Sequence, residues 1–151
     1  MWHERRTALS TRVGDYGQRT LSHGAFAIYI DRVWVVISAA GVLWACGRLQ
    51  VTPREGEADA LLDCLLIDEG MASKARHVQP QALVHGVWGA CHMEGVALSQ
   101  KHRDAVLSHV SRLIKAGVMG TRHADALRAS AAGAGLDPVQ MEHVLTAGDT
   151  A

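Results

Sequence analysis

Nine histidines and three cysteines are the side chains of this sequence best suited to metal chemistry. Two zinc ligands on one helix normally stand three or four residues apart, because that spacing places them on adjacent turns of one face. His85 and His92 stand seven residues apart, and about 10 Å of helix separates such a pair, which is too far for one zinc ion. A metal-dependent enzyme with a site assembled across a turn is therefore an alternative hypothesis. Its ligands would be His77, His85 and Cys91.

The other chemically active side chains do not form a recognisable catalytic pattern. A cysteine nucleophile needs a base within hydrogen-bond reach and surroundings that lower its pKa. Cys91 instead lies in the middle of an apolar segment. Asp59 and Asp63 share one helix face and could hold a divalent cation, although a solvated acidic face is the simpler interpretation. No phosphate-binding or nucleophile-elbow motif is present. The sequence predicts no catalytic residue and no cofactor, and favours a protein that is not an enzyme.

The C-terminal part resembles a helix-turn-helix unit over about twenty residues. Ala129, Gly133 and Val139 occupy its fifth, ninth and fifteenth positions when Asp125 is the first, and Glu142 departs from the pattern where an apolar residue is usual. The resemblance implies a DNA-binding regulator, but the second helix has no Arg or Lys to contact phosphates or bases. Nucleic acid is therefore an alternative partner that the sequence does not favour. Its contacts would come from Arg103, Arg112, Lys115, Arg122 and Arg128.

The leading hypothesis is a small non-catalytic binding or regulatory protein that acts by protein contact, like an inhibitor or an adaptor. Six acids and no base occur between Glu55 and Glu69, and such a helix can attract a partner with a basic surface. Four of the seven aromatic residues are Trp, which is enriched among interface anchors. A homodimer is compatible with this hypothesis. The expected contact residues are Glu57, Asp59, Asp63 and Asp68, with Trp34 or Trp44 as anchors if either is exposed.

Composition sets the class of protein. The 151 residues fit one domain, and fifteen basic residues balance fifteen acidic ones, so no global charge attracts nucleic acid or membrane. Twelve Arg against three Lys, with abundant Ala and Gly, indicate a coding sequence of bacterial or phage type. An odd number of unpaired cysteines and the absence of a signal-peptide pattern predict a cytoplasmic location.

The segment 25–51 holds the only Phe, one of the two Tyr and two of the four Trp, and is expected to position the rest of the chain. Phe26, Ile28 and Ile30 alternate with their neighbours, a β-branched run follows at 33–38, and the apolar run resumes at 42–51. The pattern predicts a three-stranded antiparallel β-meander. A membrane span is not expected, because the uncharged run 33–46 is shorter than the roughly 20 residues required.

Helix signals follow this segment. Thr52, Pro53 and Glu55 form a capping box with Pro at the first helical position, and Pro80 opens a second helix that ends near residue 98. Gly86 and Gly89 fall near one face of that helix, which predicts a close contact with another element. Caps at Ser99 and Asp137 mark later helices. We therefore predict a single α+β domain over 1–151, with an N-terminal segment (1–24), a meander (25–51) packed on two helices (52–98), and an all-α region of three helices (99–147).

Overall fold

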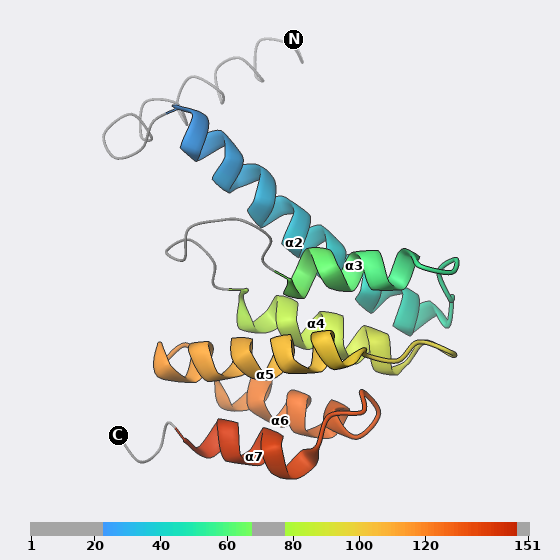
Figure 1. The fold of residues 1–151 in the computed structure, drawn as a ribbon, viewed down its shortest axis with the longest axis vertical. Coiled ribbons are helices and arrows are strands. Elements are labelled where there is room, and N and C mark those ends of the chain that lie inside the picture. The colour runs from blue at the N-terminus through green and yellow to red at the C-terminus, as the bar shows by residue number, and fades with distance from the viewer. Residues whose placement is uncertain (1–22, 68–77, 148–151) are drawn as a thin grey trace. The chain divides into compact units, whose positions relative to one another are not determined.

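The structure, a computed structural model, describes residues 23–67 and 78–147, with side chains described from Trp34 onward. The described part is entirely helical (Figure 1) and contains no strand. It divides into two compact units, the first ending at Trp34 and the second beginning at Val35. The helices are α2 (His23–Leu49), α3 (Glu57–Leu66), α4 (Pro80–Cys91), α5 (Gln100–Lys115), α6 (Thr121–Ala131) and α7 (Pro138–Thr146).

The predicted α+β class is wrong, because residues 25–49 of the segment 25–51 belong to helix α2 and do not form a β-meander. The buried residues Ala39, Ala40, Leu43 and Gly47 recur at the spacing of one helix face. Gly41, which lies between the second and third apolar runs, is a residue of the helix interior. Short apolar runs rich in β-branched residues fit a buried strand and a buried helix equally well. The β propensity of these residues therefore did not determine their structure, and they form one long helix.

Helix α3 begins later than its sequence signals predict. Its N-cap is Gly56, which has a positive φ of 81°, and its first residue is Glu57. Thr52, the expected cap, instead donates from its hydroxyl to the carbonyl oxygen of Glu94 at 3.4 Å. A Glu carboxylate does reach back as in a capping box, but it is that of Glu57, which accepts the backbone N–H of Arg54 at 2.9 Å.

The predicted caps at Ser99 and Asp137 are confirmed. The Ser99 hydroxyl accepts the backbone N–H of His102 at 3.3 Å at the start of α5. The Asp137 carboxylate accepts the backbone N–H of Val139 at 2.9 Å at the start of α7, with Pro138 at the first helical position. In the second unit, α4 packs against α3 and α6, and α5 packs against α3 and α7.

The predicted close contact at Gly86 and Gly89 is also confirmed. A Cβ atom added at Gly89 would overlap the backbone of Leu43 in α2, and one added at Gly86 would overlap the side chain of Leu65 in α3. A Cβ at Gly47 would lie 2.9 Å from the Cα atom of Gly89. Helix α4 is therefore held against the 35–49 part of α2 with its backbone in direct contact, which fixes the position of the surface described next.

Candidate functional site

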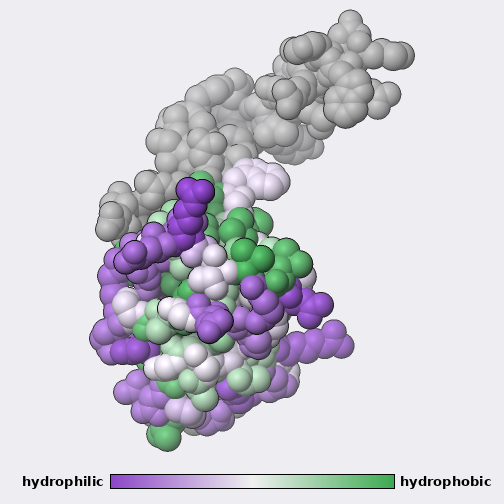
Figure 2. All heavy atoms as spheres, turned by 90° about the vertical axis from the view of Figure 1, so that its right-hand side faces the viewer, coloured by the Kyte–Doolittle hydropathy of each residue, from purple (hydrophilic) through white to green (hydrophobic). Residues whose placement is uncertain are grey.

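Helix α2 presents apolar side chains on the side that faces away from the core. Apolar residues are spread around this helix and are not confined to one face. Leu43 is buried, whereas Val35, Val42 and Leu49 expose 48, 46 and 73% of their surface. These three residues follow at intervals of seven and therefore share one side of the helix. Figure 2 shows one side of the molecule, on which apolar spheres gather beside polar ones. Exposed apolar patches of this kind mark interaction sites.

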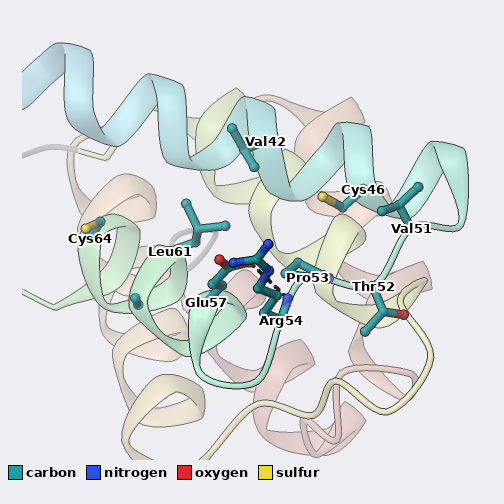
Figure 3. Close-up of a pocket in the computed structure, with 10 residues that line it drawn as sticks. Val42, Cys46, Val51, Thr52, Pro53, Arg54, Glu57, Leu61 and Cys64 are labelled. Atoms are coloured by element: carbon teal, nitrogen blue, oxygen red, sulfur yellow. Dashed lines mark hydrogen bonds between the residues drawn. The ribbon is translucent and has the colours of Figure 1, made fainter.

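A groove of about 610 Å³ lies beside this row, between α2 and α3. Val42 and Leu61 point toward one another across it (Figure 3). The residues from α3 follow the spacing of a single helix face, so this face of α3 forms one wall of the groove. The lining residues are Val42 and Cys46 of α2, the connector Val51, Thr52, Pro53 and Arg54, and Glu57, Ala60, Leu61 and Cys64 of α3. The groove is thus mainly apolar, with few polar groups at its edge, as in sites that accept an apolar partner.

The acidic residues that the sequence assigned to the contact differ in their surroundings. Glu57 lines the groove. Asp63 accepts from His102 Nε2 at 2.7 Å and from Lys101 Nζ at 2.9 Å, so it is engaged with α5. These hydrogen bonds from Lys101 and His102 hold the pKa of Asp63 below its usual range. Asp59 is exposed. Asp68 lies outside the described residues.

The contact between α3 and α5 is a hydrogen-bonded chain that sequence reasoning missed. His102 is 2% exposed, and its two ring nitrogens lie 2.7 Å from Asp63 Oδ1 and 3.0 Å from Ser99 Oγ. Ser, His and Asp are the residue types of a hydrolytic triad. Here, however, the Ser99 hydroxyl caps α5, and the buried imidazole is closed to substrate. We therefore assign a structural role to these hydrogen bonds between Asp63, His102 and Ser99. Asp63 and His102 are 39 positions apart, so no local spacing signals the contact.

The two tryptophans proposed as anchors are both exposed, Trp34 by 63% and Trp44 by 40%. Trp44 lies on the side of α2 next to α4, where its ring centroid is 5.6 Å from that of His85. The Arg48 guanidinium lies 5.9 Å from the centre of the Trp44 ring. Trp and Arg side chains are common at the centres of protein interfaces, so this flank can extend the contact surface of α2.

The proposed metal ligands are directed to different neighbours. The His85 ring lies against Trp44, and the Cys91 thiol donates to the carbonyl oxygen of Ser130 at 3.2 Å. His77 lies outside the described residues. Among the side chains described in residues 34–67 and 78–147, no three His, Cys, Asp or Glu are grouped so that they could hold a metal ion.

The basic residues proposed for DNA contact lie on α5 and α6, and several are bonded to their own neighbours. Arg128 forms ion pairs with Glu142 at 2.7 Å and with Asp125 at 2.9 Å. Val139, which corresponds to a buried position of a helix-turn-helix unit, is 76% exposed. Arg103 donates to the Leu98 carbonyl and to Gln100, and Arg112 donates to Ser108. Lys115 and Arg122 are exposed.

The cysteines should differ sharply in their reactivity. Burial raises the pKa of Cys91 from 9.0 to about 11, which lowers its thiolate fraction about a hundredfold near pH 8. Cys64 is exposed at the groove. We expect iodoacetamide to modify Cys64 first and Cys91 at least about a hundredfold more slowly than an ordinary thiol, as measured by mass spectrometry of timed samples. Cys64→Ser should remove the fast phase. Equal rates at Cys64 and Cys91 would contradict the described burial.

Comparisons with known proteins give no indication of function. No family model matches the chain, and no curated protein or solved structure is significantly similar to it. Among the described residues, no helix has the length and apolar character that crossing a membrane requires.

Proposed function

We propose that the protein is a non-catalytic binding or regulatory protein that acts by contact with another protein, through the outer side of α2 and the groove beside it. The observation that carries this proposal is the row of exposed apolar side chains Val35, Val42 and Leu49 next to the groove. A helix that is apolar on all sides is stable in water when a second surface covers its outer side. The function is therefore assigned to this surface and not to the acidic side chains alone.

The partner surface that fits this site presents apolar side chains, as one face of an amphipathic helix does. The wall formed by α3 and the facing Val42 and Cys46 can receive such side chains between two helices. Arg54 and Glu57 at the edge of the groove offer one charge of each sign. Such charges favour a particular orientation of the partner more than they add to affinity.

The test is a comparison of two single substitutions that place a carboxylate on the surface. Val42→Asp should abolish capture of a protein partner from a nuclease-treated lysate of the source cells, because it puts a charge in the centre of the apolar surface. Val118→Asp is the matched control, since Val118 is exposed to a similar degree and does not line the groove.

Both variants should keep the far-ultraviolet circular dichroism of the wild type, because both positions are substantially exposed. Equal capture by the wild type and Val42→Asp would overturn the proposed site. Capture that disappears when nucleic acid is digested would overturn protein contact as the function.

A further inference from the structure

The exposed side of α2 alternates large and small residues along one stripe. Large apolar residues stand at Val35, Val42 and Leu49, and the small residues Ser38 and Ala45 stand three positions after the first two. Spacings of three and four in alternation define the seam along which two helices pair as a coiled coil. The row of Val35, Val42 and Leu49, together with Ser38 and Ala45, is called the α2 seam below.

We propose that a second copy of this chain covers the α2 seam, with the two α2 helices antiparallel. This inference rests on the proposed function, since it names the partner of the same surface. A two-fold axis that passes between Leu43 and Trp44 places Val42 of one copy opposite Ala45 of the other, and Leu49 opposite Ser38. Two of the three large side chains then meet a small one, whereas Val35 lies opposite position 52, beyond the end of α2. Such a contact is self-complementary, as a two-fold interface requires.

A parallel pair would fill the seam poorly. Identical positions would meet, so that Val42 would face Val42 and Ala45 would face Ala45, giving crowded layers next to empty ones. Arg48 is the only charged residue between Val35 and Leu49, and a parallel pair would place the two guanidinium groups at the same level. In the antiparallel pair they are about 14 Å apart along the axis. The helix dipoles are also opposed in that arrangement.

The charges of the molecule favour a copy of itself over a strongly charged partner. The formal net charge at pH 7 is zero, so two copies approach without net repulsion. The edge of the groove carries Arg54 and Glu57, one charge of each sign, and a two-fold pair can use both signs from each copy. A nucleic acid would instead require an excess of basic side chains.

The apolar area available also matches a dimer of ordinary size. Val35, Val42, Leu49 and Val51, together with the α3 residues of the groove, expose apolar surface on the order of 500 Å². One partner of a standard interface buries about 800 Å², of which homodimers make roughly two thirds apolar. The seam and the groove therefore supply about the apolar share that such an interface needs.

The first experiment measures the mass of the purified full chain by light scattering coupled to size exclusion, over a dilution series. We expect a dimer that dissociates on dilution, and Val42→Asp should raise its dissociation constant by about a hundredfold or more. Val118→Asp should leave the constant unchanged. A wild type that stays monomeric throughout the concentration range would overturn the proposal.

The second experiment tests the antiparallel register by oxidative crosslinking. In a chain with Cys46→Ala and Cys64→Ala, Val42→Cys mixed with Ala45→Cys should form a crosslinked dimer. Val42→Cys alone should not, because its two thiols are displaced along the axis and exceed the distance a disulfide can bridge. Ser38→Cys mixed with Leu49→Cys gives the second expected pair. Efficient crosslinking of Val42→Cys with itself would overturn the antiparallel arrangement.

The failure of this inference can be separated from the failure of the proposed function. A monomeric wild type whose captured protein partner is lost in Val42→Asp would overturn the second copy and support the binding function. A monomeric wild type that also captures no partner would overturn both. A dimer with the expected crosslinks supports the second copy directly, because only the purified chain is present.

Discussion

Gly89→Ala should destabilise the protein by about 3 kcal/mol or more, because the added Cβ has no space to occupy. It would overlap the carbonyl group of Leu43 and crowd the backbone nitrogen of Trp44. Both obstacles belong to the backbone of α2, which cannot move aside as the end of a flexible side chain can. The gain in helix propensity from Gly to Ala, about 1 kcal/mol, is too small to compensate. Urea denaturation followed by circular dichroism measures the loss.

The matched control is Gly41→Ala. Gly41 is also a helix-interior glycine, but an added Cβ there meets no atom within 4 Å. This substitution should stabilise the protein by roughly 0.5–1 kcal/mol, because alanine has the higher helix propensity. Opposite signs at the two glycines are the expected result. A gain of similar size at both positions would show that α2 and α4 do not meet as described.

His102→Ala should cost about 2–4 kcal/mol of folding stability. The substitution removes a fully buried ring, leaves a cavity, and deprives Asp63 and Ser99 of a hydrogen-bond partner. The lowered pKa of Asp63 means that its contribution is present above the pKa of an unfolded aspartate and is lost as the pH falls through the lower folded value. Wild type and variant should therefore differ less in strong acid than at neutral pH, as measured by urea denaturation at each pH.

Two substitutions around the His102 ring separate the contributions that its neighbours make to folding stability. Ser99→Ala removes the cap of α5 and one bond to the ring, and should cost about 1 kcal/mol. Lys101→Ala removes an exposed partner of Asp63 and should cost less than about 1 kcal/mol. If His102→Ala were as mild as Lys101→Ala, the ring would not connect α3 to α5 as described.

The parts of the fold that the sequence predicts correctly are those with local chemical signals. The caps at Ser99 and Asp137 depend on side chains that bond to backbone groups two or three residues away. The spacing of Gly86 and Gly89 likewise marks a close contact that the structure contains. Helix α2 lacks such a signal, because its apolar residues occur on every side and conceal the helical period.

The candidate site could be predicted only in part, because it depends on contacts between distant segments. The importance of Trp34 and Trp44 depended on their exposure, and both are exposed. The groove unites residues of α2, the connector and α3, and its lining depends on which side of a helical segment 35–49 faces α3. The acidic residues of α3 follow one another in the sequence, yet Glu57 faces the groove while Asp63 bonds to α5. Only the packed helices reveal that division.

The direct contact between Gly47 of α2 and Gly89 of α4 limits how this protein can change during evolution. A side chain at either position would push the two helices apart and displace α2, which carries Val42 on its side of the groove. Distant relatives should therefore retain a glycine at both positions even after the exposed residues have diverged. A pair of glycines on two helices, about forty residues apart, is a more durable signature of this lineage than any of its polar side chains.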